Sequence, residues 1–524
     1  MYPNISSKLL LLTEALHTQY KQYMYALWMT LTTNDDSWKN KLQEEGLRYN
    51  QLLLSDSVVS LTQSPGTSDM NYSTLRQISA FKNEGLEVSC DTSYQGGYME
   101  LWNKVTSKIF TYKTFFKGRA IDENEVLTHL QTSTNSKDRE QLWMGKMKLG
   151  DVIEGDLLEL VSMRNKIAQE KGFSHFYELK LKSQELELDD LTNVIHKLRE
   201  HLDEDFTLIK SQIDNELKDK FNLQNDPMPW HYNHPFFQET HVNFMSDKSL
   251  TKAKVIKALQ GWFSDKGLDI QGIVNRSKIS NHPHNSTANY CLNIDREEDI
   301  RISSCFQQNQ KSVALLLHEL GHALYEFNIS PDVPFILRKT SQPFINEAVA
   351  LYFERLAYKK SWFTTTIGQT TSLIPFIQSK QYFINTLLKL YEAISVTTFE
   401  YELYANPSQN LNKLWWDIVE DTQRLKRPDN WDHAYWANKT QLTTLPVHSS
   451  HSLFGEVLSS QFHVLLHRTF GDSTNDESLR YLKENIFSKG NSVYWKRLLF
   501  DAFKSDIMPE YLIHEIQNNI RDEL

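Results

Sequence analysis

The chain has 524 residues, of which 40% are hydrophobic and 12% aromatic, so it can bury a substantial core. Its formal net charge is −10, and acidic and basic residues are interspersed without a basic stripe, which argues against nucleic acid as the main partner. No stretch approaches the roughly 20 apolar residues of a membrane span, and the leucine run at 9–12 is too short for a signal-peptide core. We therefore expect a cytoplasmic protein that neither crosses a membrane nor binds nucleic acid.

The cysteines, Cys90, Cys291 and Cys305, are too few for a disulfide scaffold in so long a chain. They also lack the spacing of metal ligands. We expect ordinary reduced thiols.

Helical periodicity dominates the chain from its first segment onward. Apolar side chains recur at steps of three or four residues between Leu9 and Leu27, which predicts an amphipathic helix. Residues rich in Ser, Thr, Gly and Asp around Pro65 predict a long loop over 55–73. The clearest later stripe predicts a helix over 191–221.

Two short strands are predicted at 290–294 and 299–302, and they would form a small hairpin. Helical patterns joined by short loops then fill the chain from 365 to its end, and no internal repeat is visible. We therefore predict a mainly α fold with one small β-hairpin or sheet, and a single domain over residues 1–524.

The strongest chemical signal is the pattern His-Glu-x-x-His at His318, Glu319 and His322. On a helix, residues four apart share a face, so both imidazoles can bind one zinc ion. Glu319 lies beside them, where it could take a proton from a zinc-activated water. The flanking leucines bury this helix, and burying two histidines and a glutamate without a metal would be costly.

A hydrolytic zinc site usually takes a third protein ligand and leaves one position for water. Glu347, within the apolar run 344–354, is the best candidate because a carboxylate in such a helix needs a cation. Glu354 faces the same way two turns later, and it could be the ligand instead or could orient a ligating histidine. Two histidines, a glutamate and an open position favour zinc over manganese or cobalt.

With these residues in view, the chain resembles the angiotensin-converting-enzyme family of zinc peptidases, in particular its bacterial branch. Its aromatic stretch 229–238 is similar to the family's, with His234 where an aspartate is more usual. The segments that carry the resemblance follow in the family's order: 139–143, 163–168, 172–173, 176–177, 229–232, 235–238, 295–296, 299–302, 318–325, 334–338, 347–348, 446–447, 455–456 and 460–461.

The resemblance implies a helical ellipsoid with a deep central channel, in which residues 1–90 form a lid and 91–524 form the catalytic body. It also implies cleavage of short peptides, typically with release of a C-terminal dipeptide. Position by position, it assigns zinc binding to His318, His322 and Glu347, and the general base to Glu319.

The resemblance also suggests how a substrate is held. It matches Cys291, Leu292 and Asn293 to the strand that binds substrate backbone by strand addition. In secreted relatives two cysteines around this hairpin form a disulfide, and Cys291 and Cys305 resemble that pair, although a cytoplasmic location disfavours the bond.

The chain departs from the family after Pro446-Val447, where relatives carry a tyrosine-rich run. Ser452 stands where a tyrosine usually stabilises the oxyanion, and Ser449 where another holds the substrate's C-terminal carboxylate. His448 and His451 are new in this run, and we hypothesise that at least one donates to the oxyanion or to a substrate carboxylate. The alternative is that both are surface histidines in a loop that has drifted.

A second departure lies after Glu347: the acidic residue that relatives carry four positions later is Leu351 here, which leaves Glu354 as the nearest substitute.

Three functions are compatible with these residues. The first is zinc-dependent hydrolysis of an amide bond in short peptides, with peptidyl-dipeptidase or carboxypeptidase-like specificity. The altered run after Pro446 leaves open a specialised tailoring or deacylating amidohydrolase on the same scaffold. The third is a catalytically silent zinc-containing binding protein, against which Glu319 argues because metal binding does not need it.

Overall fold

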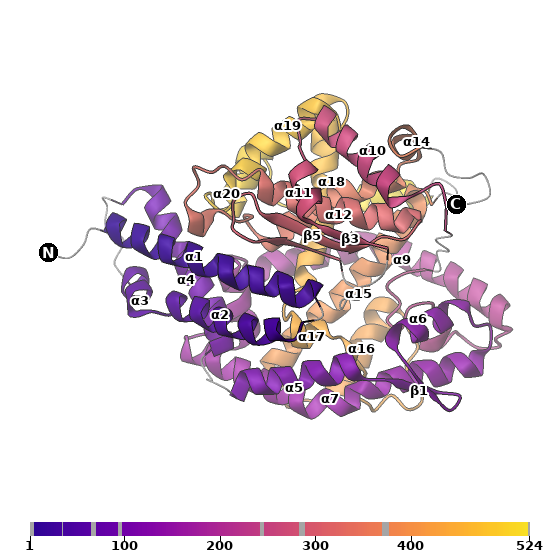
Figure 1. Ribbon diagram of the computed structural model, residues 1–524. Coiled ribbons are helices and arrows are strands. Elements are labelled where there is room, and N and C mark those ends of the chain that lie inside the picture. The colour runs from indigo at the N-terminus through magenta and orange to yellow at the C-terminus, as the bar shows by residue number, and fades with distance from the viewer. Residues whose placement is uncertain are drawn as a thin grey trace. The chain divides into compact units, whose positions relative to one another are not determined.

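The computed structural model describes residues 5–33, 35–63, 70–92, 97–240, 246–281, 289–368 and 377–521. It confirms the mainly α fold (Figure 1). The chain divides into two compact units, each built from three segments. Unit 1 comprises Met1–Ser89, Phe244–Tyr382 and Phe454–Leu512, and unit 2 comprises Cys90–Asn243, Phe383–Leu453 and Ile513–Leu524. The single metallopeptidase domain over 1–524 stays a prediction.

Unit 1 contains the N-terminal helices that were predicted as a lid, together with the helix of the His-Glu-x-x-His pattern. Four of the five boundaries between the units fall inside helices, namely α4, α15, α18 and α21. The other helices of unit 1 lie wholly within that unit. The helices with residues in this unit are α1 (Ile5–Thr32), α2 (Ser37–Leu53), α3 (Asp56–Thr62), α4 (Tyr72–Thr92), α10 (Lys252–Asp265), α11 (Gln271–Arg276), α12 (Gln310–Phe327), α13 (Pro343–Glu354), α14 (Lys360–Thr366), α15 (Ser379–Ala405), α18 (Ser449–Phe470), α19 (Asp476–Asn485), α20 (Trp495–Phe503) and α21 (Glu510–Arg521).

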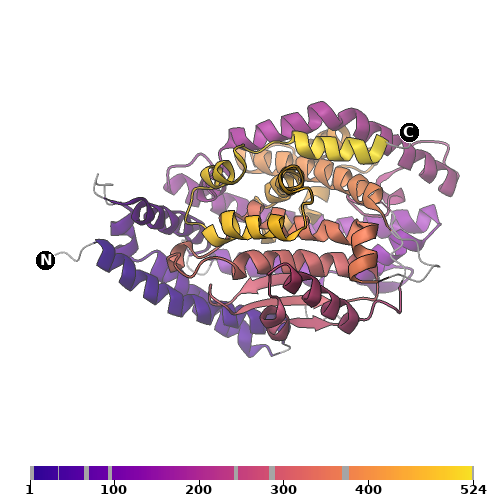
Figure 2. The same cartoon turned by 90° about the horizontal axis from the view of Figure 1, so that it is seen from above.

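The sheet of unit 1 lies directly before the metal-motif helix, as predicted. Strands β3 (Lys278–Ser280), β4 (Tyr290–Asn293) and β5 (Ile300–Cys305) form it in the order β3-β5-β4. β4 pairs antiparallel with β5, which confirms the hairpin, and β3 adds a parallel strand that the sequence did not predict. The sheet packs against α12 through β4 and β5 (Figures 1 and 2).

Unit 2 is also helical, and its elements besides the shared helices are α5 (Gly97–Thr111), β1 (Thr114–Phe116), β2 (Arg119–Ile121), α6 (Glu123–Thr132), α7 (Ser136–Glu170), α8 (Phe176–Ser183), α9 (Leu188–Phe221), α16 (Leu411–Gln423) and α17 (Gln441–Thr444). α9 confirms the helix predicted over 191–221. The hairpin of β1 and β2 was missed because its turn is Lys117-Gly118, with φ of 47° and 81°, and lysine is an unusual residue in that conformation.

The predicted loop over 55–73 is wrong in part, because α3 occupies Asp56–Thr62. Val58 and Leu61 of this helix are buried, so tertiary packing outweighs the local abundance of serine and threonine. Residues 64–69 lie outside the described part. Within the described ranges, none of the helices is both long and apolar enough to cross a membrane.

Candidate metal centre

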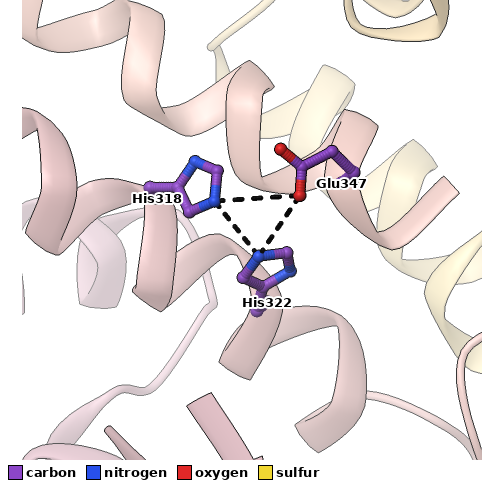
Figure 3. Close-up of side chains that lie close together, drawn as sticks. All are labelled: His318, His322 and Glu347. Atoms are coloured by element: carbon purple, nitrogen blue, oxygen red, sulfur yellow. Dashed lines mark hydrogen bonds and ion pairs between the residues drawn. The ribbon is translucent and has the colours of Figure 1, made fainter. Parts of the chain in front are cut away.

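His318 and His322 lie one turn apart on α12, as the pattern predicts. The helix begins after Asn309, whose side chain accepts a hydrogen bond from the Ser312 backbone N–H at 2.9 Å. Leu316, Leu317 and most other apolar residues of the helix are buried, so the two imidazoles are held on a fixed face. Their Nε2 atoms are 3.2 Å apart (Figure 3).

Glu347 reaches these imidazoles from α13 because two glycines permit close packing. A Cβ at Gly321 on α12 would lie 2.7 Å from Ala350 Cα, so this glycine lets the two helices touch. A Cβ at Gly455 on α18 would lie 2.6 Å from Glu347 Cγ, so α18 packs directly on the carboxylate stem. Glu347 Oε2 thus lies 3.9 Å from His318 Nε2 and 3.7 Å from His322 Nε2.

These three atoms fit a zinc ion. All lie within 4.8 Å of one another, and a point equidistant from them is about 2.1 Å from each, against typical Zn–N and Zn–O distances of about 2.0–2.2 Å. The side chains of His318, His322 and Glu347 remain 17%, 18% and 25% exposed, which leaves one side of such an ion open to water or substrate. Neutral imidazoles with one carboxylate are a donor set that suits zinc.

Glu354 occupies the other side of the His318 ring. Its Oε2 lies 2.8 Å from His318 Nδ1, the nitrogen that does not face Glu347. A carboxylate that accepts from Nδ1–H fixes the ring tautomer and leaves the Nε2 lone pair for a metal. The geometry therefore favours Glu347 as the ligand and Glu354 as the residue that orients His318.

Asn346, directly before Glu347, is a site residue that the sequence reasoning missed. Its side chain acts to raise the pKa of His322, although His322 Nδ1 and Asn346 Oδ1 are both buried and neither makes a well-formed hydrogen bond within the described residues. A hydrogen bond between these two atoms would orient His322 as Glu354 orients His318. The sequence feature that could have pointed to Asn346 is its position directly before Glu347, the predicted ligand.

The charges in this cluster shift each ionisable group. Burial lowers the pKa of His318, but the negative charge of Glu347 and the contact with Glu354 outweigh it and raise that pKa to about 9. Burial and the nearby His318 lower the pKa of His322 to about 4. Burial raises the pKa of Glu319 to about 7, and its buried Oε2 has no hydrogen-bond partner among the described residues. Glu319 is thus available to a proton-bearing group that enters the site.

Strand β4, which carries Cys291, Leu292 and Asn293, lies at the edge of the sheet and contacts α12. Burial raises the pKa of the Cys291 thiol well above its usual value, and the nearby carboxylates of Glu319 and Glu326 act in the same direction. The edge strand therefore passes close to Glu319.

Cys291 and Cys305 are both free thiols, which confirms the expectation of reduced cysteines for these two residues and shows that they do not form the disulfide found in secreted relatives. Cys291 is opposite Ile302, and Cys305 lies three residues further along β5, a separation of about 10 Å along the strand, too far for a disulfide. The side chain of Cys90 lies outside the described part.

His448, Ser449, His451 and Ser452 belong to unit 2, whereas His318, His322 and Glu347 belong to unit 1. His451 is buried, with its Nε2 2.9 Å from Gln184 Oε1 and its Nδ1 3.0 Å from His448 Nδ1. Both of its nitrogens are therefore engaged inside the protein. His448 is exposed, so of the two histidines it is the one able to meet a ligand.

Gln184 was not predicted, and the contacts it makes define the tautomers. A carbonyl accepts, so His451 Nε2–H donates to Gln184 Oε1 and leaves its Nδ1 as an acceptor for His448 Nδ1–H. His448 Nε2 then donates only when the ring is protonated. Ser449 is buried and Ser452 is partly exposed.

Comparison with known protein families adds one finding to this geometry. The family model of angiotensin-converting enzyme, a peptidase family, matches residues 235–467, a range that includes α12, α13 and the start of α18. Over this range, the chain is similar to the angiotensin-converting-enzyme family of peptidases. The match covers less than half of the 524 residues, and the bacterial branch stays a prediction. No curated protein matches the sequence.

Proposed function

We propose that the protein is a zinc-dependent metallopeptidase that hydrolyses an amide bond in short peptides. The family match supports peptide hydrolysis by a metallopeptidase. The observation that carries the zinc assignment is the convergence of His318 Nε2, His322 Nε2 and Glu347 Oε2 around one point.

In this proposal His318, His322 and Glu347 hold the ion, and Glu354 orients the first of these ligands. A bound zinc supplies Lewis-acid chemistry, because it polarises the scissile carbonyl and lowers the pKa of water. Glu319 accepts the proton of the attacking water and passes it to the leaving amine. Its buried, unpartnered oxygen and its pKa near 7 suit both transfers.

Substrate binding in this proposal uses the outer edge of β4, which has no partner strand in the described part of unit 1. A peptide laid along Cys291, Leu292 and Asn293 would gain backbone hydrogen bonds from those of their N–H and C=O groups that face outward, while its side chains point alternately to either side. Strand addition forms hydrogen bonds with the peptide backbone and not with its side chains, so such a site can bind peptides of many sequences. His448, oriented by His451 and Gln184, would donate to the oxyanion or to a substrate carboxylate, with Ser449 and Ser452 beside it.

The N-terminal helices within residues 1–90 would cover the site and exclude water and folded proteins, with 91–524 as the body of a channel. We place the enzyme in the cytoplasm. Glu319 Oε2, buried and without a hydrogen-bond partner among the described residues, favours an active enzyme over a zinc-containing binding protein, because an unsatisfied buried oxygen is costly and is not needed to hold metal.

The proposal is tested with a panel of short peptides that carry free or blocked ends, incubated with the zinc-loaded full chain. Cleavage that a chelator abolishes and added zinc restores is the expected result. Cleavage only of acyl groups or other blocking groups would point to the tailoring amidohydrolase. Zinc binding with no turnover of any member of the panel would point to the silent binding protein.

A further inference from the structure

The direction of β4 relative to α12 follows from its contacts inside unit 1. Cys291 lies near both Glu319 and Glu326, which are two turns apart on α12. Asn293 Nδ2 donates to Glu326 Oε2 at 3.0 Å, one turn beyond His322. The strand therefore runs in the same direction as the helix, and its Asn293 end points away from the metal cluster.

In an antiparallel pair, successive residues of a strand direct their backbone N–H and C=O groups alternately toward the partner strand and away from it. This alternation determines which backbone groups β4 presents on its outer edge. The Ile294 N–H donates to Asp299 O at 2.8 Å, so residue 294, and with it Leu292, faces β5. Cys291 and Asn293 then direct their N–H and C=O groups to the outer edge, where β4 has no partner strand in the described part of unit 1. Cys291 is half-buried, whereas Asn293 is only 8% exposed.

One of these outward groups is already occupied. The hydroxyl of Tyr20, on α1, donates to the Asn293 carbonyl oxygen at 3.1 Å. Burial raises the pKa of Tyr20 to about 12, so the hydroxyl remains a donor at neutral pH. The Asn293 side chain is also engaged, because its Oδ1 accepts from the Arg296 N–H at 2.7 Å and its Nδ2 donates to Glu326.

Tyr20 is held firmly in this position. The Arg296 guanidinium carbon lies 4.4 Å from the centre of its ring, and the ring of Phe335 packs edge-on at 5.8 Å. Further along α1, Trp28 packs edge-on against Tyr290 at 6.4 Å. α1 thus runs alongside β4, and Tyr20 is the α1 residue that hydrogen-bonds to the outer edge of the strand at Asn293.

We propose that Tyr20 is a specificity-determining residue that limits how far a bound peptide extends past Cys291 toward Asn293. The inference rests on the proposed function and on β4 as the peptide-binding edge. A peptide on this edge pairs with Cys291, and its next backbone N–H on that side would need the Asn293 carbonyl. The Tyr20 hydroxyl already donates to that carbonyl whether the peptide runs parallel or antiparallel to β4, so extension past Cys291 must compete with Tyr20.

The test compares two ladders of peptides that share one cleaved bond, extended one residue at a time toward the N-terminus in one ladder and toward the C-terminus in the other. The zinc-loaded full chain is assayed with each peptide, and mass spectrometry locates the cut. In the wild type, kcat/KM should fall sharply beyond a fixed length in one ladder. Tyr20→Phe should raise kcat/KM for the longest peptides of that ladder about threefold, and Tyr20→Ala about tenfold, with short peptides unaffected.

Binding gives a readout that does not depend on turnover. Fluorescence anisotropy with the same ladders and the Glu319→Gln variant, with and without Tyr20→Ala, should show the same length limit and its relief. Tyr49→Phe is the matched control, because Tyr49 donates to Glu84 Oε2 at 3.0 Å in the same region. That variant should keep the wild-type limit, and thermal melts report whether each variant is folded.

The outcomes separate this inference from the proposed function. Peptides that are cleaved or bound with the same length profile in the wild type and in both Tyr20 variants would overturn the inference alone. A ladder that is neither cleaved nor bound by any variant would overturn the inference together with the peptidase proposal.

Discussion

The metal cluster of unit 1 and the start of α18 in unit 2 both fix a histidine ring through a partner on its second nitrogen, but the partners differ in charge. Glu354, a carboxylate, lies 2.8 Å from His318, and the cluster raises the pKa of His318 to about 9. Gln184, a neutral amide, lies 2.9 Å from His451, and burial keeps the pKa of His451 well below its usual value. The first arrangement favours a cation beside the ring, whereas the second holds a neutral ring in one tautomer.

On the proposed function, this difference separates the residues that would bind metal from the residues that would position a hydrogen-bond donor. A negatively charged partner makes an imidazole a stronger ligand. A neutral partner fixes the ring without attracting an ion, so His451 serves to orient the exposed His448. The predictions that follow change one partner at a time and are ordered by the size of the expected effect.

The largest effect should come from the carboxylate that completes the metal cluster. Glu347→Ala removes one of three ligands and should abolish both zinc retention and peptide hydrolysis. Metal content after dialysis, measured by mass spectrometry together with activity, checks this. If Glu354→Ala releases zinc and Glu347→Ala does not, the two carboxylates have exchanged roles.

Removing only the charge behind His318 should have a smaller effect. Glu354→Gln keeps an acceptor for His318 Nδ1–H but loses the negative charge, so zinc affinity should fall about 10- to 100-fold. Competition with a chelator of known affinity measures it. Glu326→Gln is a suitable control, because Glu326 accepts from Asn293 and does not touch the ligands. Equal zinc affinity in Glu354→Gln and the wild type would show that the charge of Glu354 does not contribute to metal binding.

The start of α18 should respond in a way that distinguishes its two histidines. His448→Ala should lower turnover about tenfold with zinc still bound, since a donor to the substrate is lost. Gln184→Leu, which leaves both histidines in place, should lower turnover less and weaken its dependence on pH, because donation by His448 requires a protonated ring. Turnover within twofold of the wild type for both variants would leave His448 and His451 as structural residues.

The smallest effect concerns the turn that precedes these histidines. Glu400 accepts the N–H of Val447, a residue with φ of 62°, at 2.8 Å. Burial raises the pKa of Glu400 to about 7, so the folded state binds this proton more tightly than the unfolded state. The stability it contributes is complete below the pKa of an unfolded glutamate and is lost as pH rises through 7.

The Glu400→Gln variant isolates this contribution, because glutamine still accepts from Val447 but cannot ionise. Between pH 5 and pH 8 the wild-type Tm should fall by roughly 2 °C more than that of the variant. Parallel thermal melts at both pH values measure it. Identical slopes would show that Glu400 does not titrate in this range.

The contrast between the two regions also explains what could be predicted from the sequence. His318, Glu319 and His322 lie within about one turn of one helix, so local periodicity placed them together, and the apolar run around Glu347 singled out the carboxylate that the structure brings to the two histidines. The hairpin of β4 and β5 beside α12 and the helix over 191–221 were also predicted from local sequence patterns.

Gln184 could not be found in this way, because it lies 267 residues from His451 and carries no chemical signal of its own. Tyr20 is 273 residues from Asn293, and within α1 it is one of many apolar or aromatic residues in a stripe. Whether Cys291 and Cys305 pair was left open, because the strand register that separates them is not defined by the sequence. Helix α3 was missed because burial of two side chains outweighed a loop-like composition.

The central claim, that a zinc held by His318, His322 and Glu347 works with Glu319 as general base, is tested most directly by Glu319→Gln. The account predicts that this variant retains one equivalent of zinc and binds short peptides, while kcat falls about 10²- to 10⁴-fold. A kcat close to that of the wild type, with zinc bound, would contradict it.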